Sequence, residues 1–345
     1  MILNKFHQLP IEDKKAILQE TSRLSGMSSF AVEKDWWVVQ ALAIIFEMEI
    51  GDHLVFKGGT SLSKAWKLID RFSEDIDLAV DRSFLGFEGD LSKKQVTELR
   101  KCANDYITET FYPNLIKKFQ ENGFNDVKFE IVEAQSSDQD PRIIEIYYPN
   151  VIDSPGYIHP KIQVEIGCRS LREPFSIQSF SSLIDEHFPD KDFTQPPIKI
   201  PVVNPERTFL EKIFLLHEEF QRPSEKIRVD RLSRHLYDIY QLSKTDCVEK
   251  AMNDRALYET IVKHRYRFTR LGGVNYNLHQ PQTINPIPPK DLIEDWETDY
   301  KTMQQQMIYG DSPSFEKMVE SIRELVQKIN GLDWQMEHVF PVSQV

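Results

Sequence analysis

Hydrophobic and polar positions in the first half of the chain switch repeatedly between a helical and a strand periodicity. Pro10-Ile11-Glu12-Asp13 has the proline and the acidic first turn of a helix start, and a second helix is predicted from Ser29 to Met48. Strand-like runs and further helical segments follow, which favours a mixed sheet that carries helices. The predicted strands are Leu54–Phe56, Asp75–Val80, Val127–Val132, Ile143–Tyr148 and Lys161–Ile166, with helical segments up to Leu68 and over residues 92–121.

The pattern changes near residue 190, where prolines become frequent. The segment from Thr194 to Pro205 is predicted to be extended, as expected of a domain junction. We therefore expect an α+β protein, with a mixed sheet and flanking helices in a domain over residues 1–200 and a mostly helical domain over residues 201–345. The helices predicted in the second domain cover residues 206–221, 229–243, 248–265, 289–309 and 313–329.

Asp75 and Asp77 form the most informative polar pattern in the chain. Side chains alternate between the two faces of a strand, so Ile76, Leu78 and Val80 share one face and both aspartates share the other. Two carboxylates roughly 7 Å apart repel each other, and a divalent cation is the usual compensation. Magnesium prefers carboxylate oxygens together with substrate phosphates. Taken alone, the pair also fits a solvated strand face or a metal-dependent glycosyltransferase.

A glycine turn precedes this strand. The apolar run that ends at Phe56 breaks at Gly58-Gly59 and continues through Thr60 and Ser61 into a predicted helix. Backbone N–H groups exposed by such a turn suit a phosphate group. The segment lacks the Gly-Lys-Ser/Thr ending of a Walker loop, and a tight turn without a ligand is the alternative interpretation. A phosphate-binding turn followed by a carboxylate pair is typical of phosphoryl or nucleotidyl transfer.

The charge balance limits what the surface can bind. The net charge of −12 argues against a protein that coats nucleic acid over its whole surface, but it permits a local basic groove. One stretch, Lys263–Arg270, holds no acid and interleaves aromatic with basic residues, which favours an RNA backbone or, alternatively, a solvated helix end. A second basic cluster comprises Arg222, Lys226, Arg228, Arg231 and Arg234.

Cysteine usage and hydropathy indicate the compartment. Cys102, Cys168 and Cys247 are few and far apart, which argues against a disulfide framework and a thiolate zinc site and fits the cytoplasm. The most hydrophobic stretch, Trp36–Phe46, is about half as long as a membrane span requires, so we expect no membrane association. The N-terminus has no apolar run of the length of a signal peptide.

Several sequence motifs occur together and carry a family resemblance. The glycine turn and the aspartate pair resemble the nucleotidyltransferases of the DNA polymerase beta type, although 15 residues between Gly59 and Asp75 slightly exceed the usual spacing. Four motifs together are similar to the AbiEii/AbiGii family, toxins of bacterial abortive-infection and type IV toxin–antitoxin systems. These motifs are Phe56–Lys64, Arg71–Leu78, Pro205–Ile213 and Arg234–Tyr240.

This resemblance implies further site residues. The superfamily takes a third carboxylate from a later strand, for which Glu165 is the best match and Glu145 a weaker one. In the toxin family a lysine and an aspartate complete the site, which points to Lys212 and Asp238. Lys212 would neutralise a triphosphate, and Asp238 would orient Lys212 or act as a base toward the acceptor hydroxyl. The family commonly has Arg-Asp where this chain has arginine followed by His235.

The implied activity is magnesium-dependent transfer of a nucleoside monophosphate from an NTP. Asp75, Asp77 and Glu165 would hold one or two Mg²⁺ ions, and the NTP phosphates would lie on Gly58, Gly59, Thr60 and Ser61. The resemblance makes an RNA, tRNA in particular, the expected acceptor and an antitoxin the expected partner. Transfer to a protein hydroxyl is the alternative within catalysis. A catalytically degenerate binding module is the alternative outside it.

Overall fold

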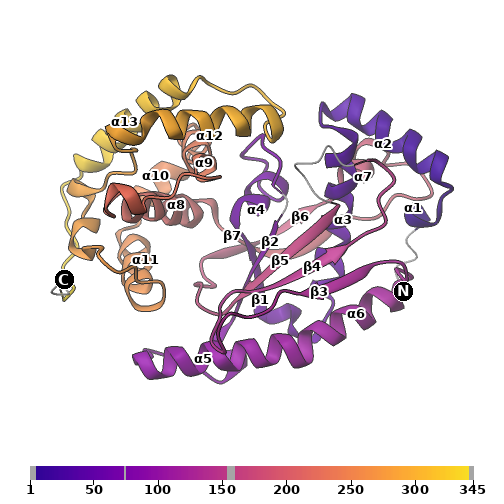
Figure 1. Ribbon diagram of the computed structural model, residues 1–345, viewed down its shortest axis with the longest axis horizontal. Helices are drawn as coiled ribbons and strands as arrows, with labels where there is room; N and C mark the ends of the chain where they lie inside the picture. Colours follow the sequence, from indigo (N-terminus) through magenta and orange to yellow (C-terminus); the bar gives the residue numbers. More distant parts are fainter. Residues whose placement is uncertain (1–4, 74, 154–159, 342–345) are drawn as a thin grey trace. The chain divides into compact units, whose positions relative to one another are not determined.

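The computed structural model describes residues 5–73, 75–153 and 160–341, and the chain forms two compact units (Figure 1). The first unit comprises residues 1–66 and 72–203, and the second comprises residues 67–71 and 204–345. The predicted boundary at residue 200 lies inside the last strand of the first unit. The second unit also takes in a five-residue segment, residues 67–71, that directly precedes the strand of Asp75 and Asp77.

The first unit is built on a seven-stranded mixed sheet with the order β3-β4-β5-β2-β1-β7-β6. The central strand β2 pairs antiparallel with β1 and parallel with β5, and β1 pairs parallel with β7. The strands are β1 Leu54–Lys57, β2 Asp75–Val80, β3 Lys128–Ile131, β4 Arg142–Tyr147, β5 Lys161–Gly167, β6 Phe175–Phe180 and β7 Ile198–Val203.

One helix, α3 (Ser29–Phe46), is apolar around most of its circumference and is buried against this sheet. The side chain of Ser28 accepts a hydrogen bond from the backbone N–H of Ala31 and so caps its first turn. Trp36 and Trp37 belong to the same core as the inward-facing isoleucines and valines of β2, β4 and β5. The other helices of this unit are α1 Lys5–Gln8, α2 Ile11–Ser25, α4 Gly58–Lys64, α5 Lys93–Tyr106, α6 Tyr112–Glu121 and α7 Leu183–His187, with single turns η1 Glu49–His53, η2 Arg82–Leu85 and η3 Ile107–Phe111.

The elements predicted up to Ile166 are present with shifted ends, whereas α1, β6, α7 and β7 were not predicted as regular elements. The five predicted strands are present, and the segment 92–121 forms α5 and α6 joined by one π-helical turn. The helix predicted to reach Leu68 ends at Lys64, because Lys67 takes a left-handed backbone conformation with φ of 53°. The extended proline-rich segment holds β7, which pairs with β6 along its length, Pro201 lying opposite Ile177, and with β1 at Phe56↔Val202.

The second unit is helical in its regular structure. Pro205 starts α8 at the position where a helix tolerates proline. The helix predicted over 229–243 begins only at Ser233, where the Asp299 side chain accepts hydrogen bonds from the backbone N–H groups of Arg231 and Ser233. The helix predicted over 248–265 is split at Asp254, which caps the second part. The helices are α8 Pro205–Glu219, α9 Ser233–Leu242, α10 Cys247–Asn253, α11 Arg255–Phe268, α12 Ile293–Gln306 and α13 Phe315–Asn330, with turns η4 Ser224–Lys226, η5 Tyr276–His279, η6 Pro281–Thr283 and η7 Lys290–Leu292.

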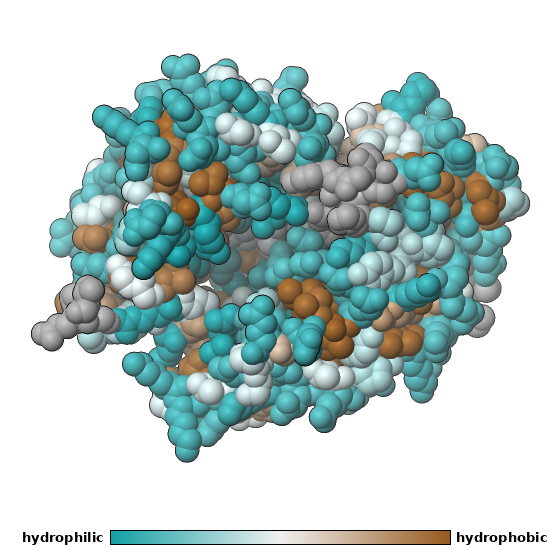
Figure 2. Space-filling model, in the orientation of Figure 1, coloured by the Kyte–Doolittle hydropathy of each residue, from teal (hydrophilic) through white to brown (hydrophobic). Residues whose placement is uncertain are grey.

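The structure thus confirms the predicted α+β class, with a mixed sheet and helices followed by a helical region. Hydrophilic residues dominate the face drawn in Figure 2, and apolar residues appear on it in separate patches. Among the described residues, no helix combines the length and the apolarity needed to cross a membrane.

Candidate active site

Three carboxylates share one face of the sheet. In the parallel pairing of β2 with β5, Asp77 lies directly beside Glu165 and Asp75 beside Gln163. The residues between them, Ile76 among them, are buried in the core on the opposite face. The alternation predicted from the sequence is therefore present, and two neighbouring strands bring Asp75, Asp77 and Glu165 to a single polar surface.

The glycine turn packs directly on Asp77. Gly58 has φ of 80°, and a Cβ atom placed on it would lie 2.0 Å from Asp77 Oδ2. Both observations require glycine, because a side chain would strain the backbone and displace the carboxylate. Lys57, opposite Asp77 in the β1–β2 pairing, holds its Nζ 3.9 Å from Asp77 Oδ1. The turn and the carboxylate are therefore parts of one local structure.

The hydroxyl groups of the turn are used internally. The buried Thr60 hydroxyl donates to the backbone carbonyl of Asp75 and lies 2.9 Å from Ser73 Oγ. The buried Ser61 hydroxyl donates to the carbonyl of Gly58 at 2.9 Å. These bonds fix the start of β2 against α4. A phosphate bound by this turn would therefore meet backbone N–H groups more readily than these side chains.

The two candidates for the third carboxylate have different partners. Glu165 Oε1 accepts a hydrogen bond of 2.8 Å from Gln163 Nε2. Glu145 is held by Lys161 Nζ at 2.5 Å and by the Tyr147 hydroxyl. The hydrogen bond to Glu145, together with burial and the charge of that carboxylate, raises the pKa of Tyr147 to about 12. The ammonium group of Lys161 therefore already neutralises the Glu145 carboxylate.

The donor set on the polar face suits magnesium, although the side chains do not form a closed cage. Among residues 5–73, 75–153 and 160–341, no three His, Cys, Asp or Glu side chains are grouped to hold a metal ion. Magnesium is usually bound by one or two carboxylates together with substrate phosphates, so a preformed all-protein cage is not required. The register of Asp75, Asp77 and Glu165 therefore fits a metal that arrives with a phosphorylated substrate.

The other two predicted site residues meet in the helical unit. Lys212 on α8 and Asp238 on α9 are both buried, and Lys212 Nζ lies 2.9 Å from Asp238 Oδ2. Burial alone would raise the pKa of Asp238, but the charges of Arg71 and Lys212 hold it well below the usual range. Asp238 is therefore a carboxylate with two cationic partners, and its lowered pKa makes it a weak base.

Two residues without a predicted role complete this cluster. Arg71 forms a bidentate pair with Asp238, with Nε 2.7 Å from Oδ1 and Nη2 2.8 Å from Oδ2. His235 Nδ1 lies 3.4 Å from Lys212 Nζ. Burial and the charges of Lys212 and Arg234 lower the pKa of His235 well below its usual value, so its imidazole is neutral. The signal for Arg71 was present in the sequence, because it opens the motif that contains Asp75 and Asp77.

Four cations of the two basic stretches are paired with acids of the same unit. Arg265 forms a bidentate pair with Glu218, and Lys263 pairs with Glu259. Of the second basic cluster, Arg222 and Arg228 both pair with buried Glu219. The sequence shows the cations at regular spacing, but not that α8 turns two consecutive glutamates toward them. These residues therefore form a weaker nucleic-acid surface than their number suggests.

Comparison with known proteins gives the family. The sequence model of the nucleotidyl transferase AbiEii toxin family, type IV toxin–antitoxin system, matches residues 40–328. No curated protein matches the chain.

Among solved structures, the nucleotidyltransferase toxin MenT4 from Mycobacterium tuberculosis shares 18% identity at a TM-score of 0.42, covering 91% of this chain and 97% of that one. JHP933 from Helicobacter pylori shares 12% identity at a TM-score of 0.42, covering 87% and 91%. The family match covers most of the chain. The chain belongs to the AbiEii family of nucleotidyltransferase toxins from type IV toxin–antitoxin systems.

Proposed function

We propose that this nucleotidyltransferase transfers a nucleoside monophosphate from an NTP to a hydroxyl group of an RNA, with tRNA as the first candidate. One observation carries the proposal for the reaction centre: Asp75, Asp77 and Glu165 lie on the same face of two adjacent strands, next to the turn at Gly58. When bound, Mg²⁺ supplies Lewis-acid activation of the α-phosphate and charge stabilisation of the leaving pyrophosphate.

Each residue of this face has a defined task in the proposal. Asp75 and Asp77 are the first metal ligands, and Glu165 is the third. The backbone at Gly58 and Gly59, with Thr60 and Ser61 fixing its shape, receives the phosphates. The acceptor hydroxyl attacks the α-phosphorus in line, the bond to the bridging oxygen breaks, and pyrophosphate leaves as the hydroxyl proton is released.

In the helical unit, we assign Lys212 to phosphate binding and Asp238 to its orientation. An ammonium group acts as a point charge that suits a phosphate, and Asp238 fixes it from 2.9 Å. The strongly lowered pKa of Asp238 argues against its use as the base for the acceptor hydroxyl. Of the two roles considered for Asp238, we therefore propose orientation of Lys212 and not that of a base toward the acceptor hydroxyl.

The partners and the compartment belong to the same proposal. A type IV toxin–antitoxin family implies a cognate antitoxin, and we propose that one accompanies this chain. A cytoplasmic location is consistent with the three cysteines, which are free, two of them being buried. Burial raises the pKa values of the Cys168 and Cys247 thiols, which keeps both in the unreactive thiol form.

The test is a transfer assay. Purified protein is incubated with Mg²⁺, each α-labelled NTP in turn, total bacterial RNA and lysate protein. Label in a tRNA-sized band that is lost in an Asp75→Asn, Asp77→Asn double variant supports the proposal and identifies the nucleotide. The control is Asp105→Asn with Glu109→Gln, which changes the charge equally at two exposed positions of the same unit and is expected to transfer normally.

Transfer to a protein hydroxyl is the second candidate. The neutralisation of Arg265, Arg222 and Arg228 by buried glutamates favours it, because it removes part of the predicted RNA surface. Label in a protein band instead of an RNA band would select this reaction. If no NTP gave label that the double variant loses, the proposed transfer reaction would be wrong. A catalytically degenerate module that only binds a partner would then be favoured.

A further inference from the structure

A buried ion cluster in the helical unit contains one carboxylate and two cations in direct contact. Arg71 and Asp238 form two parallel hydrogen bonds, and their side chains are 2% and 0% exposed. Lys212 contacts the same Oδ2 atom that Arg71 Nη2 reaches. Because one negative charge faces two positive charges, the three groups together carry a net charge of about +1.

A further cation lies nearby and increases this surplus. The charge of Arg234 contributes to lowering the pKa values of both Lys212 and His235. Burial is the larger cause of both shifts, and Asp238 opposes them. His235, which touches Lys212, is neutral and adds no negative charge. Excess positive charge out of water is costly unless an anion compensates it.

Arg71 is held in place by its own short segment. The backbone N–H of Tyr309 donates to the carbonyl of Asp70 at 3.1 Å, and Arg71 forms a β-bridge with Ile308. A Cβ on Gly310 would lie 2.9 Å from Asp70 Cβ, so this glycine allows the two segments to approach closely. The guanidinium therefore comes from a fixed backbone and is directed at a fixed carboxylate.

Without Arg71, the remaining pair would be balanced. Asp238 and Lys212 would then form a one-to-one ion pair, and the lysine charge would be largely cancelled for any third group. With Arg71 bound across both carboxylate oxygens, Asp238 is already neutralised and Lys212 retains an uncompensated charge.

We propose that Arg71 is a positioning residue that acts through Asp238, leaving the Lys212 ammonium in surplus so that it binds a phosphate group. The inference rests on the proposed function for the identity of that phosphate as part of an NTP. A backbone phosphate of RNA has the same chemistry, and the experiment separates the two sources.

The experiment measures affinity rather than catalysis. Binding of inorganic triphosphate, without Mg²⁺, is measured by calorimetry for the full chain and its variants. Arg71→Met is expected to weaken binding about tenfold or more, because Asp238 then cancels Lys212. Adding Asp238→Asn to Arg71→Met is expected to restore most of the affinity, since Lys212 regains its surplus charge. A residue that only supported the fold would show further loss in the double variant.

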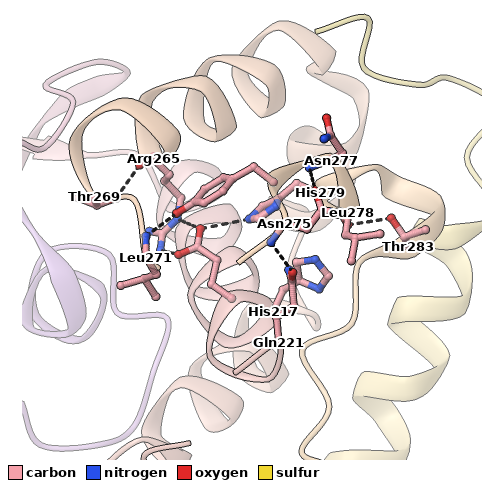
Figure 3. A network of polar contacts seen from close by, with 12 residues as sticks. His217, Gln221, Arg265, Thr269, Leu271, Asn275, Asn277, Leu278, His279 and Thr283 are labelled. Carbon is pink, nitrogen blue, oxygen red and sulfur yellow. Dashed lines mark hydrogen bonds and ion pairs between the residues drawn. The ribbon is translucent and has the colours of Figure 1, made fainter. Parts of the chain in front are cut away.

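A matched control exists in the same unit. Arg265, whose side chain is 16% exposed, forms another bidentate pair with buried Glu218, with Nε–Oε1 and Nη2–Oε2 distances of 2.6 Å (Figure 3). Arg265→Met, alone or with Glu218→Gln, is expected to leave triphosphate affinity unchanged. Arg71→Gln serves as a second neutral variant if Arg71→Met does not fold, because its amide still donates to Asp238.

The outcomes decide between the possibilities. Unchanged triphosphate affinity in Arg71→Met and Arg71→Gln, or no restoration in the double variant, overturns the proposal. A parallel titration uses a short RNA without a 5′-triphosphate, and loss for this RNA alone overturns the nucleotide assignment in favour of backbone phosphate. If the protein transfers label but the Arg71 variants bind triphosphate normally, this inference is wrong and the proposed function stands. If the variants show the predicted affinity pattern but the protein transfers no label, the proposed function is wrong and this inference stands.

Discussion

Two arginine–carboxylate pairs in the helical unit have nearly the same geometry and different surroundings. Arg71 binds both oxygens of Asp238, and Arg265 binds both oxygens of Glu218. In both pairs the carboxylate is fully buried. Burial raises the pKa of each carboxylate on its own, and the facing cations more than reverse that effect.

The third partner distinguishes the two pairs. The Asp238 carboxylate also contacts the Lys212 ammonium group. The Glu218 carboxylate instead contacts the imidazole of buried His279, whose Nε2 lies 3.1 Å from Glu218 Oε1 (Figure 3). The Glu218 pair joins α8 to α11, and the contact with His279 joins it to η5. The Asp238 pair joins α9 to the short segment before β2.

This difference indicates that the geometry of an arginine–carboxylate pair does not by itself tell whether the pair has a structural or a ligand-binding role. A balanced buried pair ties helices together, and removing one partner leaves an uncompensated charge. A pair with a surplus cation holds a charge that a ligand can use. We therefore interpret the Glu218 pair as structural and the Asp238 cluster as functional, and the following predictions test that distinction.

The largest expected effect is on stability in Glu218→Gln. The substitution leaves the mostly buried Arg265 guanidinium, which is 16% exposed, without its carboxylate, and we expect the free energy of unfolding to fall by about 3–5 kcal/mol. Urea denaturation measures this change. The rate of nucleotide transfer per folded molecule is expected to stay the same. A fall in transfer with unchanged stability would contradict the structural role.

Lys212→Met should show the opposite pattern. The variant leaves Arg71 and Asp238 as a balanced pair, so the free energy of unfolding should change by only about 1 kcal/mol. Loss of a preorganised charge at the reacting phosphates should lower the transfer rate about 100-fold, or roughly 3 kcal/mol. Initial rates with the labelled NTP and urea midpoints check both numbers. If the transfer rate and the free energy of unfolding fell by equal amounts of free energy, the distinction between a structural Glu218 pair and a functional Asp238 cluster would not hold.

Lowering the pH is expected to reduce the free energy of unfolding through the buried histidines next to each ion pair. Burial, with the nearby His279, lowers the pKa of His217 to about 4. The unfolded chain takes up this proton below about pH 6.5 and the folded chain does not, so stability falls as the pH drops from 6.5 toward 4. At pH 5 the expected loss is about 2 kcal/mol. His235, whose pKa is also lowered by burial, contributes with the same sign.

Urea unfolding at pH 7 and pH 5 tests this expectation with His217→Gln as the comparison. The variant should lose less stability between the two pH values than the unsubstituted protein. Identical losses in both would show that His217 does not set the acid dependence. Asp238 should not contribute in this range, because above about pH 5 its carboxyl is ionised both in the folded chain, where its pKa is lowered, and in the unfolded chain.

The sequence predicted those features that local alternation and turn chemistry determine. Asp75 and Asp77 follow a period-two pattern, and the structure has them on the face opposite buried Ile76. The turn at Gly58 was visible as a glycine pair. Its close approach to Asp77 was not, because that contact depends on the pairing of β1 with β2.

The remaining features depend on contacts between segments far apart in the sequence. Arg71 and Asp238 are 167 residues apart, and no local pattern relates them. The start of α9 was misplaced because its N-terminal N–H groups are bound by Asp299 of another helix. Likewise, Arg265 looked available for RNA because the sequence does not show that Glu218 faces it. Such cases need the tertiary structure, since their partners come from elsewhere in the chain.

The smallest expected effects come from exchanging each arginine for lysine. Arg71→Lys and Arg265→Lys keep the charge and lose the second parallel hydrogen bond, so each should lower the free energy of unfolding by about 1–2 kcal/mol. If surplus charge governs the Asp238 cluster, triphosphate affinity in Arg71→Lys should stay within about threefold of the unsubstituted value. Calorimetric titration of both variants checks this. If Arg71→Lys bound as weakly as Arg71→Met, the planar guanidinium geometry would be the controlling feature. The contrast between the two pairs would then lie in the shape of the Asp238 cluster rather than in its charge.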